Sequence, residues 1–148
     1  MKANFNSRFN HDFVETFQDG ECIFKEGDSG TDLYIVQKGS VRIVKEMSGD
    51  QIEIAAFERG DFFGDIGLLQ NVPRYASAYA VGEVRLLILG RAGFLLKIRR
   101  DPTFAFEMLQ QLSHRVKISL EGHLKIIDRF ALSKEEVQNV LRELTGKL

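Results

Sequence analysis

The sequence has little cysteine, no excess of charge of one sign and no long apolar run. Each of these features, where present, would by itself indicate a class of protein. The chain has a single cysteine, Cys22, so no disulfide can form within it. Lys and Arg number 20 against 21 Asp and Glu, a balance that leaves no overall electrostatic footprint for nucleic acid or for an anionic membrane surface. The longest apolar runs, such as residues 86–89, are far shorter than the roughly 18 residues needed to span a bilayer. We therefore expect no membrane-spanning segment.

The N-terminal residues 1–8 lack the apolar core of a signal peptide. Together with the single cysteine, this favours a reducing, cytoplasmic location. With 44% hydrophobic and 28% charged residues, the 148-residue chain has the composition of one soluble globular domain. That composition excludes a disordered or collagen-like protein.

Patterns for metal binding and catalysis are also missing. His114 and His123 are nine residues apart, which puts them on opposite faces of a helix, and Cys22 has no second cysteine to share a zinc ion. No Gly-x-Ser-x-Gly or other nucleophile and base signature is present. The sequence therefore predicts no catalytic residue, no metal site and no cofactor.

Glycine divides the chain into two parts, because 11 of the 13 glycines lie before residue 95. Their recurrence about every ten residues is typical of an all-β sandwich or barrel built from short strands. Segments rich in β-branched and aromatic residues predict strands at 21–24, 33–36, 41–44, 51–54, 76–79 and 84–89. Ser48-Gly49-Asp50 predicts one hairpin turn, and Lys38-Gly39 another.

The second part has a helical pattern. From Pro102, which suits the first turn of a helix, side chains on one face recur at alternate spacings of four and three. The face consists of Ala105, Leu109, Leu112, Val116, Ser119, His123, Ile126 and Phe130. A capping box at residues 133–136 begins a last short helix, and Gly146 marks its end. The fold class predicted is thus mainly β with C-terminal helices, divided into residues 1–100 and 101–148.

Residues 60–77 contain the densest group of special residues. Gly64 and Gly67 bracket the start of a possible helical turn at 66–71, and the N–H groups at a helix start favour an anion. Arg74 follows after a short loop fixed by Pro73. An arginine beside a helix N-terminus forms a phosphate site, with each charge-assisted hydrogen bond worth about 1.5–3 kcal/mol. Asp65 would repel a phosphate, so we expect it to face a hydroxyl group instead.

Residues 63–80 resemble the phosphate-binding cassette of the cyclic-nucleotide-binding domains, the family of catabolite activator proteins and of cAMP-dependent protein kinase regulatory subunits. In that pattern an arginine that follows a proline stands nine positions after an acid that follows a glycine, as Arg74 stands after Asp65 here. Residues 20–28 and 33–39 look like the first strands and structural glycines of the family. The resemblance covers roughly residues 13–130. It implies an eight-stranded β-jelly roll containing the cassette, and then a long helix that covers the base or pairs two protomers.

The resemblance also implies a ligand-binding set. Arg74 and backbone N–H groups of the cassette fall where the family binds the cyclic phosphate, and Asp65 falls where the family has a glutamate on the ribose 2′-hydroxyl. Arg115 and Ser119 fall on the long helix, near the ribose acid and the adenine, while two isoleucines cover the base. The complete set is Gly64, Asp65, Ile66, Gly67, Arg74, Tyr75, Ala76, Arg115, Ser119, Ile43 and Ile54.

Three cassette positions depart from the family pattern. Asp65 is one methylene shorter than glutamate, Gly67 stands where Ala or Ser is usual, and Tyr75 stands where a small residue is common. Because Tyr75 lacks the small hydroxyl side chain that cGMP-selective relatives place there, the sequence favours cAMP over cGMP. The same departures keep an alternative open, in which this fold is a degenerate non-binding scaffold or a dimerisation domain.

The expected function is that of a cyclic-nucleotide sensor that signals by moving its C-terminal helices. Its expected partners are a cyclic mononucleotide, a second copy bound through the helix at 102–130, and an unknown downstream protein. We expect no DNA binding. A helix-turn-helix needs a second helix, the recognition helix, in the major groove, and the sequence predicts only one capped helix after the long one. An enzyme of the cupin kind would need histidines close together in the barrel, and this sequence has none so placed.

Overall fold

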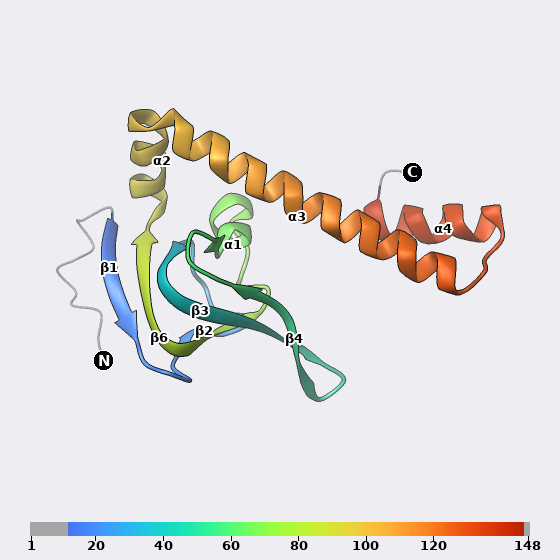
Figure 1. Ribbon diagram of the computed structural model, residues 1–148, viewed down its shortest axis with the longest axis horizontal. Helices are drawn as coiled ribbons and strands as arrows, with labels where there is room; N and C mark the ends of the chain where they lie inside the picture. Colours follow the sequence, from blue (N-terminus) through green and yellow to red (C-terminus); the bar gives the residue numbers. More distant parts are fainter. Residues whose placement is uncertain (1–11, 147–148) are drawn as a thin grey trace. The chain divides into compact units, whose positions relative to one another are not determined.

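The computed structural model describes residues 12–146 (Figure 1). Residues 1–8, where the sequence predicts no signal peptide, lie outside this range. The chain divides into two compact units, the first ending at Ala105 and the second beginning at Phe106. The first unit contains all the strands and two complete helices, and the second contains most of α3 (Pro102–Arg129) and all of α4 (Lys134–Thr145).

The first unit is built on an antiparallel sheet with the strand order β1-β6-β3-β4, in which β2 also pairs with β6 and β5 with β3 (Figure 1). The strands are β1 (Asp12–Phe17), β2 (Cys22–Phe24), β3 (Leu33–Met47), β4 (Asp50–Phe57), β5 (Phe62–Phe63) and β6 (Ser77–Leu89). Buried side chains alternate with more exposed ones along β6, as a half-buried strand requires. The predicted class, mainly β with C-terminal helices, is confirmed.

Strands β3 and β6 each replace two of the strands that the sequence predicts. The first half of β3 pairs with residues 85–89 of β6, and its second half pairs with residues 77–81 and with β4. The predicted hairpin at Lys38-Gly39 is therefore wrong, because β3 continues through it with an irregular register between Val36 and Ser40. Gly39, at φ +83°, accommodates a bulge in place of a turn. For this reason six strands are assigned within the described residues, against the eight implied by the resemblance.

The other predicted hairpin turn is confirmed. Met47 lies opposite Asp50 in the register of β3 and β4, and both turn residues, Ser48 and Gly49, have positive φ angles of 53° and 86°. Two consecutive positive φ angles are the signature of the tight turn whose twist matches that of the flanking strands.

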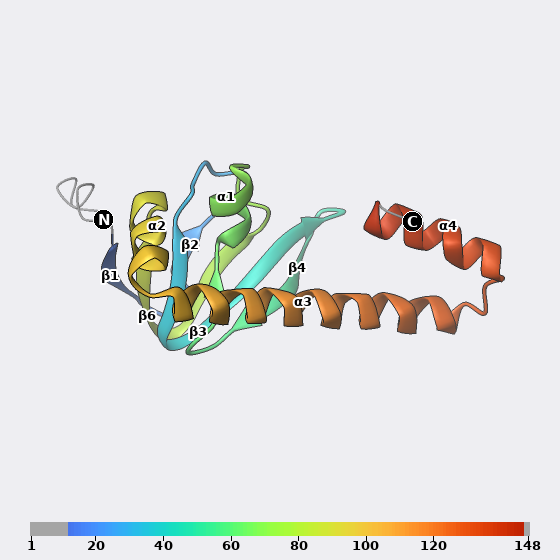
Figure 2. The ribbon, with the colours of Figure 1, turned by 90° about the horizontal axis from the view of Figure 1, so that it is seen from above.

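The helices agree with the sequence at three points and differ at one. Helix α1 (Asp65–Gln70) is the predicted short turn, α3 begins at Pro102, and α4 begins with a complete capping box between Ser133 and Glu136. Helix α2 (Arg91–Arg100) was not predicted, since the sequence analysis placed the first long helix at Pro102. No described helix has the length and apolarity to cross a membrane. Within the second unit, α4 doubles back along the end of α3 (Figure 2).

The bulge in β3 generates a prediction about stability. A Cβ atom at Gly39 would collide with the backbone oxygen of Glu83, whereas a Cβ atom at Gly49 would have no neighbour within 4 Å. Both glycines have positive φ angles, so alanine at either position costs about 1–2 kcal/mol in backbone strain. We expect Gly39→Ala to lower the free energy of unfolding by at least about 1 kcal/mol more than Gly49→Ala. Urea unfolding measures both, and equal losses would contradict the close packing at Gly39.

Candidate functional site

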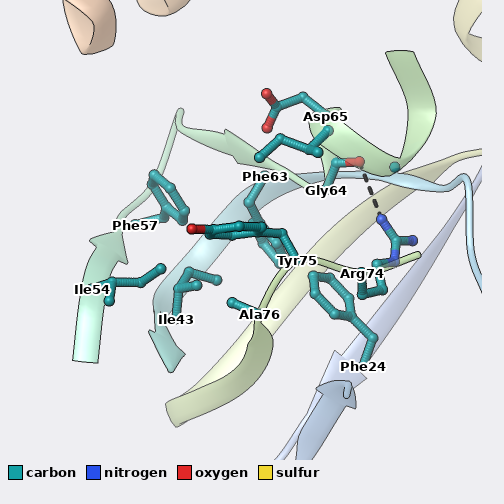
Figure 3. A pocket seen from close by; sticks show the side chains of 12 residues that line it. Phe24, Ile43, Ile54, Phe57, Phe63, Gly64, Asp65, Arg74, Tyr75 and Ala76 are labelled. Carbon is teal, nitrogen blue, oxygen red and sulfur yellow. Dashed lines mark hydrogen bonds between the residues drawn. The ribbon is translucent and has the colours of Figure 1, made fainter. Parts of the chain in front are cut away.

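A pocket in the first unit opens beside helix α1 and encloses about 610 Å³, its open mouth included (Figure 3). Its wall is apolar apart from Asp65 and Arg74. The lining residues are Phe24, Ile43, Ile54, Phe57, Phe63, Gly64, Asp65, Ile66, Gly67, Arg74, Tyr75 and Ala76. Nine of the eleven residues that the sequence predicts as ligand contacts are thus brought together in one cavity.

Arg74 provides the charge of the pocket. Arg74 is 5% exposed. Between residues 12 and 146 it is the only buried residue with a charged side chain. Its Nη1 donates to the Gly64 carbonyl oxygen at 3.1 Å, and its Nη2 donates to the Asp32 carbonyl oxygen at 3.0 Å. Since backbone carbonyls carry no formal charge, these two bonds orient the guanidinium and do not neutralise it.

The Asp32 side chain adds to the electrostatics around the guanidinium. Burial raises the pKa of this carboxyl, and the positive charge of Arg74 lowers it in part. The Arg74 backbone is fixed as well, because its N–H donates to the Asp28 carbonyl oxygen and its own carbonyl oxygen accepts from the Gly27 N–H, both at 2.8 Å. The loop before β3 thus holds Arg74 by both its main chain and its side chain.

Three glycines form a niche around the guanidinium. A Cβ atom on Gly30 would lie 2.9 Å from Nε of Arg74, and one on Gly64 or Gly67 would lie 3.0 Å from Nη1. At Gly67 the added atom would also approach the Gly30 carbonyl oxygen to 2.6 Å. These distances leave no room for a side chain at Gly67, because a larger residue would occupy the space that Arg74 and the Gly30 backbone take.

Helix α1 contributes backbone groups to the same end of the pocket. Its N-cap is Gly64, with no side-chain capping bond, and the first helical bond runs from the Leu68 N–H to the Gly64 carbonyl at 3.2 Å. The first turn of a helix has N–H groups that find no acceptor inside the helix, and the helix dipole favours negative charge there. The cassette backbone and Arg74 therefore make this end of the pocket suitable for an anion.

Aromatic rings continue the wall away from the guanidinium. The guanidinium carbon of Arg74 lies 4.3 Å from the centre of the Phe24 ring, while Tyr34 stacks on Phe63 at 5.0 Å and Phe63 on Phe57 at 5.9 Å. Burial raises the pKa of Tyr34 to about 12, so this ring is neutral at physiological pH. The rings thus form a continuous row from Phe24, which contacts Arg74, to Phe57 in the apolar part of the wall.

Phe24, Phe57 and Phe63 also line the pocket, although the sequence does not predict them as ligand contacts. Phe63 directly precedes Gly64 and could have been found from its place at the start of the cassette. Phe24 and Phe57 carry no comparable signal, because the strand register alone brings them to the pocket. Arg115 and Ser119 lie on α3 in the second unit, and their contact with a ligand remains a prediction.

No metal-binding cluster occurs within residues 12–146. In that part of the chain, no three His, Cys, Asp or Glu side chains lie close enough together to hold an ion. The functional groups that the pocket does contain are a guanidinium, a carboxylate, backbone amides and an apolar wall.

Comparison with known proteins agrees with this geometry. The family described as "Cyclic nucleotide-binding domain" matches residues 14–101, and the chain belongs to this family. It is 36% identical to the cyclic AMP receptor protein of Thermus thermophilus over 83% of this chain and 55% of that protein. The crystal structure of a Thermus thermophilus catabolite activator protein superposes with a TM-score of 0.70 at 32% identity, covering 80% of this chain and 55% of the other.

A second solved relative comes from a kinase regulator. The regulatory domain of Toxoplasma gondii PKA, crystallised with cAMP, superposes with a TM-score of 0.57 at 27% identity, covering 71% of this chain and 40% of that one. The chain thus spans about half or less of the length of these relatives. The relatives are regulatory proteins, and the implied jelly-roll fold is the one they share with this chain.

The glycine niche generates a prediction. We expect Gly67→Ala to lower the free energy of unfolding by about 1–3 kcal/mol, because the new methyl group displaces either Arg74 or the loop at Gly30. Gly122→Ala is the matched control, since a Cβ atom there has no neighbour within 4 Å. In the interior of α3 it should raise stability by about 1 kcal/mol. Thermal unfolding measures both variants, and stabilisation by Gly67→Ala would contradict the niche.

Proposed function

We propose that this chain is a cyclic-nucleotide sensor and regulatory module that binds a cyclic mononucleotide in the pocket beside α1. The observation that carries the proposal is the buried Arg74 guanidinium, held by uncharged carbonyls at one end of a cavity whose other lining side chains, apart from Asp65, are largely apolar. A buried positive charge at the end of an apolar cavity favours a ligand with an anionic group at one end and a flat apolar body at the other.

In the proposed complex, Arg74 and the backbone N–H groups of the cassette hold the cyclic phosphate. These N–H groups belong to Gly64, Ile66, Gly67 and Ala76. Asp65 accepts a hydrogen bond from the ribose 2′-hydroxyl, and Ile43 and Ile54 cover the base. In this complex Arg115, on α3, lies near Asp65, the acid that contacts the ribose, and the Ser119 hydroxyl contacts the adenine.

We assign cAMP as the preferred ligand over cGMP. Two observations support this choice: Tyr75 takes the position of the small hydroxyl residue typical of cGMP-selective relatives, and the Toxoplasma gondii relative was crystallised with cAMP. The output is a movement of the helices after residue 95, produced when the nucleotide binds one arrangement of the helices more tightly than another. The module has no catalytic role in this proposal, and it acts in the cytoplasm on a downstream protein.

Replacement of Arg74 tests the binding site directly. We expect Arg74→Gln to weaken cAMP binding tenfold or more, because the loss of charge-assisted hydrogen bonds worth about 1.5–3 kcal/mol each exceeds the 1.4 kcal/mol that corresponds to a factor of ten. Arg85→Gln is the control, since Arg85 is an exposed β6 residue outside the pocket. Isothermal titration calorimetry gives both affinities.

The result also separates this function from its alternative. Unchanged cAMP affinity in Arg74→Gln would remove the assignment of the phosphate site. A wild-type chain that binds no cyclic nucleotide at all would leave the degenerate scaffold or dimerisation domain as the function of this fold.

We also propose that the module forms a homodimer through the helix at 102–130. Side chains on its heptad-like face are largely exposed, with Leu109 at 62%, Val116 at 58% and Phe130 at 71%. An apolar stripe of this spacing is the surface on which two helices pair.

Light scattering tests the dimer. We expect the wild-type chain to have twice the monomer mass at concentrations on the order of tens of micromolar, and the double variant Leu109→Glu, Val116→Glu to be a monomer, because two buried carboxylates would face the partner helix. Lys125→Glu, an exposed position on the opposite side of α3, should remain dimeric. A monomeric wild-type chain would remove this part of the proposal.

A further inference from the structure

Tyr75 occupies an unusual position in the pocket. Its side chain is 57% exposed, yet it belongs to the wall of the cavity. In the view of Figure 3 the ring lies across the pocket, with its hydroxyl end pointing away from Arg74. The ring therefore runs from the anionic end of the pocket toward its apolar end.

Lys45 holds this ring in place. Its Nζ lies 4.1 Å from the centre of the Tyr75 ring and donates to the Tyr75 carbonyl oxygen at 2.7 Å. The same Nζ donates to Oε1 of Glu26 at 2.6 Å, and Oε2 of Glu26 accepts from the Glu46 N–H at 3.1 Å. The hydrogen bond from Lys45 lowers the pKa of Glu26, so this carboxylate is ionised at neutral pH. One face of the ring is thus covered by an ammonium group with a fixed position.

The Lys45 contact leaves Tyr75 57% exposed and part of the pocket wall, so the ring keeps surface for a ligand. Because Arg74 and the cassette hold the anion at one end, the rest of the ligand extends toward the end lined by Ile54, Phe57 and the Tyr75 ring. A nucleobase is flat and has an apolar face, and an aromatic side chain is the surface on which such a face stacks.

We propose that Tyr75 is the stacking platform for the base of the nucleotide and that Lys45 is its positioning residue. This inference rests on the proposed function and assigns part of the base recognition to the cassette itself. Stacking grows with the area of ring overlap, so a purine cyclic nucleotide gains more from Tyr75 than a pyrimidine one.

Replacements of Tyr75 test the platform by calorimetry with cAMP. Tyr75→Phe keeps the ring and should bind like the wild type. Tyr75→Ala should bind about fivefold to more than a hundredfold more weakly, the range found when an aromatic ring stacked on a base is removed. Tyr79→Ala is the matched control, because Arg42 lies 5.0 Å from the centre of its ring and the residue is outside the pocket. It should leave the affinity unchanged.

Two further measurements distinguish stacking from a structural effect. First, the preference for cAMP over cyclic UMP should fall in Tyr75→Ala and persist in Tyr75→Phe. Second, Lys45→Met should weaken cAMP binding more in the wild-type background than in Tyr75→Ala, because the second variant has lost the ring that Lys45 positions and keeps only the backbone carbonyl contact. Additive effects of the two substitutions would overturn the role of Lys45.

A spectroscopic measurement reports the contact directly. The chain contains no tryptophan, so Tyr75→Trp introduces a single reporter. We expect cAMP to quench its emission, and we expect no change in the equivalent Tyr79→Trp variant.

The outcomes separate this inference from the proposed function. If the wild-type chain binds cAMP and Tyr75→Ala binds it equally well, the platform is overturned and the proposed function stands. If the wild-type chain binds no cyclic nucleotide, both fail.

Discussion

The site depends on one physical constraint, which is the burial of a positive charge that no hydrogen bond neutralises. A guanidinium removed from water is stable only if its N–H groups are satisfied. The structure meets this need with carbonyl oxygens from two separate segments, Asp32 in the loop before β3 and Gly64 at the start of α1. Arg74 therefore ties the loop, the short helix and the segment before β6 together, and the charged end of the pocket is also a structural junction of the first unit.

The packing around this junction explains residues that are otherwise anomalous. Gly30 and Gly67 have no side chain because the guanidinium and the backbone of the opposing segment fill that volume. The short helix α1 has only six residues and no capping side chain. It is held by its neighbours more than by its own propensity, since isolated helices of this length are unstable. A segment of this kind is suited to respond when an anion adds partners to its first turn.

The sequence predicted those parts of the molecule that local chemistry determines. Pro102 and the capping box at Ser133 mark helix starts by their own geometry, and the cassette pattern brought Arg74 to the pocket. The sequence did not predict the features that depend on pairing between distant strands. Gly39 suits a hairpin turn as well as a bulge, and only the register of β3 against β6 selects the bulge. Likewise, Lys45 meets the Tyr75 ring because the pairing of β3 with β6 sets Val44 opposite Ser77, which no local pattern encodes.

The two ends of the pocket divide recognition between different kinds of interaction. At the Arg74 end, charge-assisted hydrogen bonds act on any suitably shaped phosphate and carry little information about the base. At the other end, Ile43, Ile54, Phe57 and Tyr75 present surfaces whose contribution depends on the area and planarity of the ligand. Selectivity therefore has to come from the apolar end. On the proposed function, this division makes a departure from the family pattern at Tyr75 compatible with an intact anion site: the two positions are adjacent in sequence, yet their side chains belong to the charged and the apolar parts of the pocket wall.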